Sequence, residues 1–124
     1  MNILLIAIGG AIGATLRYTI IRFFFYLNIV TFPYGTLVVN IAGSFLIGFL
    51  AFWLVNRYLH NEAVRLFLII GVLGAFTTFS SFSLDTLHLL LQNRYFAAIL
   101  YVLSNVLLCI IAAFLGMLIA KLGK

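Results

Sequence analysis

The chain has 124 residues, of which 66% are hydrophobic and only 7% are charged, and its mean hydropathy is +1.30. A soluble domain is typically about 45–50% apolar, so this composition excludes an ordinary water-soluble protein. A membrane-crossing helix needs about 20 apolar residues, so the length allows four spans and no separate catalytic domain. The net charge of +5 comes from basic residues scattered singly at segment ends, which indicates contact with lipid headgroups rather than with nucleic acid.

The first two predicted spans carry small residues that allow close helix packing. The first span covers residues 3–25, and its small residues are Gly9, Gly10, Gly13 and Ala14. Pro33 and Gly35 disfavour a helix interior and predict a loop after it. The second span covers residues 36–55, and Asn40 is its one strongly polar interior residue.

The third predicted span, residues 63–92, is long for one crossing. Its middle is rich in glycine, threonine and serine, which weaken helix propensity, so we predict a break near residues 74–80. Non-helical backbone at membrane depth is tolerated only where it is buried in protein or lines a cavity. The fourth span covers residues 95–120 without a charged residue. The sequence thus predicts an all-α integral membrane protein, with one four-helix domain over residues 1–124.

The basic residues give only a weak preference for one orientation in the membrane. With four spans, the side that holds the N-terminus carries Arg57, Arg65, Lys121 and Lys124. The opposite side carries Arg17, Arg22 and Arg94. An excess of basic residues on the cytoplasmic side normally sets the orientation of a membrane protein. Because four basic residues on one side face three on the other, we predict that the chain inserts in both orientations. Two opposed copies would form an antiparallel, dual-topology homodimer, and a weakly biased single orientation is the alternative.

Residues suited to catalysis are few and scattered. Glu62 and Asp85 are far apart in the sequence, His60 is placed in a connecting loop, and His88 lies near a helix end. This spacing supports no carboxylate pair, metal-ligand cluster or nucleophile–base triad. The single cysteine, Cys109, lies in an apolar run and forms no intrachain disulfide. An enzyme is not expected.

Aromatic rings and hydroxyls share the middle of the third span. Phe76, Phe79 and Phe82 recur every three residues. The hydroxyl residues among them are Thr77, Thr78, Ser80, Ser81 and Ser83. By spacing alone, a packed aromatic core whose serines bond back to earlier carbonyls is the preferred interpretation. The alternative is that the positive ring edges face a small anion, to which Asn40 would add amide donors.

Three motifs together resemble the Fluc, or CrcB, family of fluoride channels. They are Gly-Ala-Thr-Leu-Arg17 in the first span, Gly35-Thr36-Leu-Val-Val-Asn40 in the second, and Gly74-Ala-Phe-Thr77-Thr78-Phe79-Ser80-Ser81-Phe82-Ser83 in the third. The resemblance covers all four spans, and the third-span motif is the most specific. It implies a multi-pass protein of a prokaryotic inner or plasma membrane that exports fluoride passively and gives fluoride resistance.

The resemblance also implies an antiparallel homodimer with two pores. Phe79 and Phe82 correspond to the family's pore phenylalanines, and Asn40 corresponds to its pore asparagine. Tyr101 matches a pore tyrosine on the fourth helix, and Ser81 is placed with these pore residues. The partners implied are fluoride, a second copy of the chain and the lipid bilayer.

A structural sodium ion at the dimer centre is implied as well. In the family its ligands are backbone carbonyls, at positions that match Gly74 and Thr77 here. Such a site is physically reasonable, because a helix break frees carbonyl oxygens that suit a hard cation. Arg17 matches a basic residue near the family's pore entrance, where it would attract anions. The alternative for Arg17 is an anchor that extends its charge to the membrane interface.

The chain departs from the family at three positions. Asn105 and Cys109 stand on the fourth span where hydroxyl residues are usual, and Asp85 stands where glutamate is usual.

Two other functions are considered. A small multidrug-resistance-like exporter would resemble its relatives in carrying a glutamate in the first span, and this chain has none there. A non-transporting membrane scaffold needs only the small-residue and aromatic packing, and it predicts no ion flux.

Overall fold

The computed structural model describes residues 1–27, 31–57 and 61–123, and every element in these ranges is helical. The elements are α1 (Asn2–Tyr26), α2 (Tyr34–Arg57), α3 (Glu62–Val64), the π-helix η1 (Arg65–Leu73), α4 (Gly74–Phe76), α5 (Phe79–Leu91) and α6 (Tyr95–Leu122). They form four stretches that are long and apolar enough to cross a membrane, which confirms the predicted number of spans. The centres of two predicted connections, residues 28–30 and 58–60, lie outside the described residues, as does Lys124.

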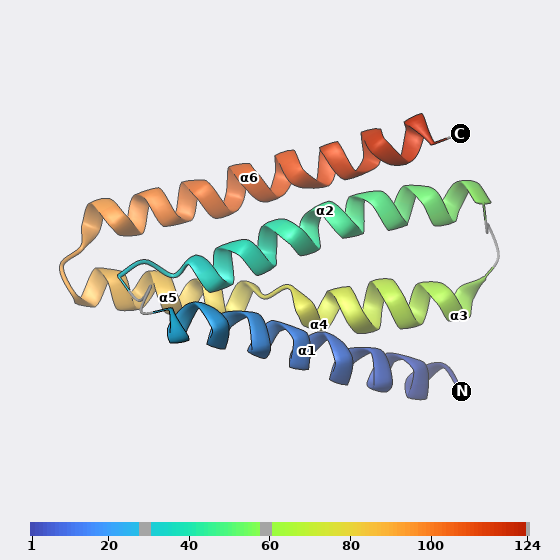
Figure 1. Cartoon of the computed structure of the whole chain (residues 1–124), viewed down its shortest axis with the longest axis horizontal. Coiled ribbons are helices and arrows are strands. Elements are labelled where there is room, and N and C mark those ends of the chain that lie inside the picture. The colour runs from blue at the N-terminus through green and yellow to red at the C-terminus, as the bar shows by residue number, and fades with distance from the viewer. Residues whose placement is uncertain (28–30, 58–60, 124) are drawn as a thin grey trace.

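The four spans associate mainly as two pairs. Helix α2 packs along α6, and α1 packs along η1 and α4, while α1 and α2 also touch (Figure 1). Both termini lie at the same end of the bundle, as an even number of spans requires (Figure 1). Near the opposite end, α5 contacts α6 and α2, so the third span bridges the two pairs.

Small residues hold each pair together through close backbone approach. A Cβ atom added to Gly13 of α1 would lie 2.0 Å from the carbonyl oxygen of Val72 in η1. In the other pair, a Cβ atom on Gly48 of α2 would lie 2.0 Å from the carbonyl oxygen of Ala113 in α6. Any side chain at these glycines would push the helices apart, so the predicted small-residue packing of the first two spans is confirmed at these positions.

Large apolar side chains cover much of the outer surface. Phe96 and Ile99 of α6, for example, are exposed. Such a surface suits contact with lipid and does not suit contact with water. The buried cluster lies among α2, α5 and α6, and its members are Leu37, Phe82, Leu89, Ala98 and Tyr101.

After the short α3, the third span continues as a π-helix, which the sequence did not predict. Its wider turns run from Arg65 to Leu73 and pack on α1. At Gly71 the two backbones nearly touch, because a Cβ atom added there would lie 3.0 Å from the Cα atom of Gly9. An apolar run suits α- and π-helical turns alike, so the hydrophobic pattern does not distinguish them.

Candidate functional site

The predicted break in the third span lies at Thr77 and Thr78. Both residues have extended backbones, with φ and ψ of −77° and 155° for Thr77 and −152° and 120° for Thr78. The N–H and the hydroxyl of Thr77 both donate to the carbonyl of Leu73, which closes the preceding turn. The hydroxyl oxygen of Thr78 accepts the N–H of Ser81 at 3.1 Å and caps the start of α5. The two threonines therefore end one helix and begin the next.

Asn40 of α2 supplies hydrogen bonds that the break lacks. Its Oδ1 accepts the N–H of Thr78 at 2.9 Å, and its Nδ2 donates to the carbonyl of Thr78 at 3.1 Å. The same Nδ2 also donates to Oδ1 of Asn105 in α6 at 3.1 Å. The sequence suggested Asn40 as an amide donor to an anion. In this structure its Nδ2 serves two protein acceptors instead, so its first role is to hold the break at membrane depth, where unpaired backbone groups are costly.

Beside the break, α2, α5 and α6 enclose an open groove of about 420 Å³. Four of the predicted site residues, Asn40, Thr77, Phe79 and Phe82, line it. The rest of the lining is Ser44, Ile47, Thr78, Asn105, Val106, Cys109 and Ile110. Asn105 and Cys109, whose roles the family pattern left open, thus lie on the same groove as the predicted pore residues.

The two phenylalanines differ in how the chain covers them. The side chain of Phe79 is 77% exposed, whereas that of Phe82 is only 8% exposed. Their ring centroids are 5.2 Å apart with the planes inclined by 55°. Phe82 also lies 5.5 Å from the ring of Tyr101, and Tyr101 stands edge-on to Phe32 at 5.4 Å. A continuous row of rings therefore leads from the groove into the buried cluster.

At the far end of this row lies the carboxylate of Asp85. Its Oδ2 accepts the hydroxyl of Thr36 at 2.7 Å and the hydroxyl of Tyr101 at 3.1 Å. Asp85 and Thr36 also line a second cavity, of about 340 Å³, together with His88. The fully buried Tyr101 thus contacts a lining residue of each cavity, since its ring packs against Phe82 and its hydroxyl donates to Asp85.

Gly74, the first residue of α4, and Thr77, which follows α4, are the predicted sodium ligands, and the N–H groups that would bond to their carbonyls in a continuous helix bond elsewhere. The N–H of Thr78, which would bond to Gly74 in a continuous helix, goes to Asn40. The N–H of Ser81, which would bond to Thr77, goes to the hydroxyl of Thr78. Carbonyl oxygens are suitable ligands for a monovalent cation, so this donor type fits the predicted ion. One chain offers only part of a coordination shell at these two positions.

Ser81 and Arg17 lie outside the lining of the groove. Ser81 takes part in the cap of α5, where its hydroxyl accepts a hydrogen bond from the Thr78 hydroxyl at 3.2 Å. Ser83 donates back to the carbonyl of Phe79 at 2.9 Å, which confirms for this serine the local bonding that the sequence predicted.

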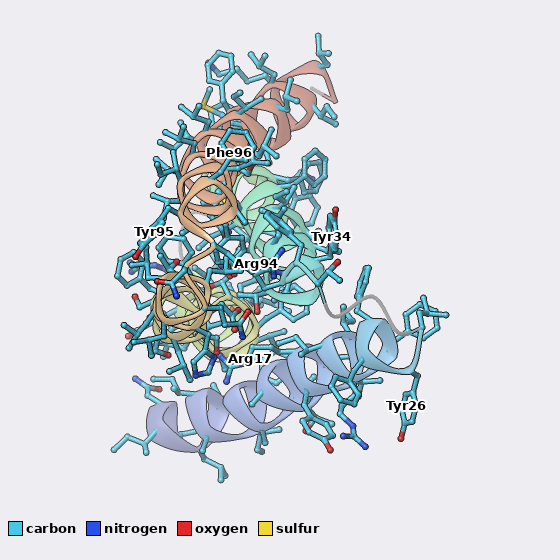
Figure 2. All side chains as sticks on the ribbon, turned by 90° about the vertical axis from the view of Figure 1, so that its left-hand side faces the viewer. Arg17, Tyr26, Tyr34, Arg94, Tyr95 and Phe96 are labelled. Carbon is cyan, nitrogen blue, oxygen red and sulfur yellow. The ribbon has the colours of Figure 1, made fainter. Side chains whose placement is uncertain are left out.

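Arg17 lies one helical turn after Gly13, on the side of α1 that faces the third span (Figure 2). Its side chain is half-buried. Within the described ranges, its guanidinium has no hydrogen-bond or ion-pair partner. The positive charge is therefore not neutralised by the part of the chain that the structure describes.

Metal ligation by side chains finds no support in the described residues, which contain no group of three histidine, cysteine, aspartate or glutamate side chains close enough to share an ion. The lining of the groove instead combines aromatic, hydroxyl and amide side chains with apolar ones. These groups suit a small anion or water, and they provide no nucleophile–base pair.

Comparison with known proteins gives consistent matches over nearly the whole chain. Residues 4–117 match the family model described as CrcB-like protein, Camphor Resistance (CrcB). A protein of Magnetococcus marinus named fluoride-specific ion channel FluC is 44% identical over 98% of this chain and 99% of its own length. Proteins with the same name from Rhizobium meliloti and a Roseiflexus species are 42% and 46% identical, over 97% and 98% of this chain and 96% and 98% of their own.

Proposed function

This chain belongs to the CrcB-like family, and we propose that it is a fluoride-specific ion channel whose pore includes the groove between α2, α5 and α6. It is a multi-pass membrane protein, and members of this family are channels rather than enzymes. The observation that carries the pore assignment is the convergence of Asn40, Phe79 and Phe82 at one groove beside a helix break.

We propose that fluoride passes along the ring edges of Phe79 and Phe82. An aromatic ring has a negative face and a positive edge, so an anion that has lost part of its water is stabilised at the edge. Thr77 and Cys109 also line the groove, whose walls are mostly apolar. Selectivity over chloride would follow from a narrow path whose few donors replace water only for the smaller ion.

Export through such a pore needs no coupled energy source. In acidic surroundings, hydrogen fluoride crosses lipid uncharged and dissociates in the less acidic cytoplasm. The interior-negative potential then drives fluoride outward. One charge across about 100 mV corresponds to about 2.3 kcal/mol, which supports roughly a 50-fold gradient. Passive outward flow therefore lowers intracellular fluoride and gives resistance.

A second, antiparallel copy is proposed to close the groove. In one chain the groove is open on one side, and its lining includes Asn40, Thr78 and Asn105 beside the helix break. Polar backbone at membrane depth is stable only when protein or a water-filled cavity covers it, and lipid does neither. The near balance of basic residues on the two sides permits opposed insertion. In this arrangement the exposed ring of Phe79 belongs to an interface rather than to the lipid surface.

The same dimer would hold a sodium ion at its centre. We propose that the carbonyl oxygens of Gly74 and Thr77 from both copies bind it, since each chain offers only part of a shell. The ion would supply a positive charge that fixes the two breaks against each other. Replacing sodium by the large cation N-methylglucamine should therefore lower the fraction of purified protein that migrates as a dimer. An unchanged dimer fraction in sodium-free buffer would contradict the site.

Arg17 is proposed to attract fluoride towards the pore. Its half-buried charge has no partner within the described ranges and lies on the side of α1 that faces the third span. Salt screens such attraction over about 10 Å at 0.1 M, so Arg17→Gln should slow fluoride entry most at low ionic strength. A loss that does not depend on salt would instead support an anchoring role.

Growth of fluoride-sensitive cells tests the function in a membrane. Cells without a fluoride exporter of their own should grow in acidic medium containing fluoride when they express this chain, and should accumulate less fluoride. Phe79→Ile should abolish the protection at equal protein level. If the protein is a membrane scaffold, neither the wild-type protein nor Phe79→Ile should protect the cells. If it is a proton-coupled multidrug exporter, it should give resistance to organic cations instead.

A further inference from the structure

A hydrogen-bonded chain of two asparagines connects α6 to the break in the third span. Asn105 Nδ2 donates to the carbonyl of Tyr101 on its own helix at 3.3 Å, and Asn105 Oδ1 accepts from Asn40 Nδ2 at 3.1 Å. Asn40 in turn pairs with both the N–H and the carbonyl of Thr78. The side chains of Asn40 and Asn105 are only 9% and 5% exposed, so water does not compete readily for these bonds.

The orientation of both side-chain amides is fixed by the backbone groups that they bond at the two ends of this hydrogen-bond network. The N–H of Thr78 only donates and its carbonyl only accepts, so Asn40 must present Oδ1 to the first and Nδ2 to the second. Asn105 must then present Oδ1 to Asn40, because a flipped amide would set two NH2 groups against each other and would turn its oxygen towards the carbonyl of Tyr101. The network has one arrangement that satisfies every member.

We propose that Asn105 is a positioning residue for the pore, and that it acts by holding the amide of Asn40 against Thr78. This inference rests on the proposed function and adds a residue to its machinery. Without the acceptor on Asn105, the Asn40 amide keeps its bonds to Thr78 but loses the contact that fixes it from the side of α6. If the side-chain amide of Asn40 rotates, the N–H and the carbonyl of Thr78 lose their hydrogen-bond partners.

The consequence for conduction follows from the position of Thr78. Its hydroxyl caps α5 at the N–H of Ser81, so its backbone sets where α5 begins. Phe79 is the first residue of α5, and Phe82 lies one turn further. A shift at Thr78 therefore moves both rings relative to the groove, and displacements of about 1 Å are enough to disturb a precisely positioned site.

Backbone hydrogen exchange separates this role from simple packing. In wild-type protein reconstituted in lipid nanodiscs, the amide of Thr78 should exchange slowly. Asn105→Leu, which keeps the approximate size but removes the acceptor, should speed that exchange by about three- to tenfold, as expected for one lost hydrogen bond. Asn40→Ala should speed it further, and the double variant should exchange no faster than Asn40→Ala alone. Ser104→Val, at the neighbouring position of α6 and outside the groove, is the matched control.

Fluoride efflux from liposomes supplies the functional reading. Asn105→Leu should lower the rate by about tenfold or more while the protein remains a dimer, and Ser104→Val should stay within about twofold of wild type. Unchanged exchange at Thr78 in Asn105→Leu, or faster exchange spread evenly over α5 and α6, would overturn the proposal. So would additive effects of the two asparagine substitutions. A wild-type protein that conducts no fluoride would refute the proposed function instead, and the exchange data would still decide whether Asn105 holds Asn40.

Discussion

The side-chain amide of Asn40 pairs with both backbone polar groups of Thr78, at 2.9 and 3.1 Å. Through this pairing α2 replaces the helical hydrogen bonds that the third span gives up at its break. The replacement allows an extended backbone to persist among four membrane helices, and it places the start of α5 beside the groove. The predictions below follow from this geometry.

Both phenylalanine rings should be required for conduction, but only the loss of the Phe82 ring should also destabilise the fold. Phe79→Ile removes a ring that is 77% exposed, so fluoride efflux should fall by at least about tenfold, equivalent to about 1.4 kcal/mol, with the fold intact. Phe82→Ile should lower efflux similarly and also reduce stability by about 1 kcal/mol, because Phe82 is buried. Phe96→Ile, which removes an equally exposed ring at the start of α6, is the control. Undiminished efflux in both groove variants would reject the ring-edge path.

Two glycines of α1 should respond oppositely to alanine. The Cβ atom of Gly13→Ala would lie 2.0 Å from a backbone carbonyl of Val72, so the variant should lose about 1–3 kcal/mol of stability. At Gly10 the nearest atom is the Cβ of Ala75, 4.0 Å away, so Gly10→Ala should be neutral or stabilise the helix by up to about 1 kcal/mol. Thermal unfolding in detergent measures both. Equal melting temperatures would show that α1 does not pack closely on η1.

Tyr101 should contribute its ring and its hydroxyl separately. Tyr101→Phe keeps the contact with Phe82 and removes only the bond to Asp85, so it should cost about 1–2 kcal/mol of stability and leave efflux within about threefold. Tyr101→Ala removes the ring as well and should abolish efflux. The comparison uses thermal unfolding and liposome flux on the same preparations. Loss of flux in Tyr101→Phe would instead assign the ion path to the hydroxyl.

Added positive charge should fix the orientation of the chain. Leu122→Arg with Gly123→Arg adds charge at the end that holds both termini, and Leu91→Arg with Gln92→Arg adds it at the opposite end. Each double variant should insert in one orientation and fail to protect cells from fluoride, because orientation follows the basic residues. Expressing the two together should restore protection. Full protection by either variant alone would exclude an obligatory antiparallel dimer.

Much of the fold could be predicted from the sequence because membrane spans depend on local composition. The first span was expected at 3–25 and α1 runs from Asn2 to Tyr26, and the break expected near 74–80 lies at Thr77 and Thr78. Long apolar runs, proline, glycine and hydroxyl clusters act locally, so they are readable without a structure.

The hydrogen bonds across the site could not be predicted, because they join distant positions. Asn40 and Thr78 are 38 positions apart, and Asn40 and Asn105 are 65 apart. Helical periodicity tells which residues share a face of one helix and does not tell which face meets which neighbour. The available signal for Asn105 was a lone amide within a 28-residue helix whose one charged residue is Lys121 in the last turn, and such an amide marks a polar contact without naming its partner.

Fluoride efflux from liposomes that hold the purified protein is the most direct test of the central claim, with valinomycin releasing the potassium countercharge and chloride as the comparison ion. A fluoride channel predicts rapid fluoride efflux without a proton gradient and no efflux of chloride. Absence of fluoride efflux from a verified dimer with sodium present, or equal efflux of the two halides, would contradict it.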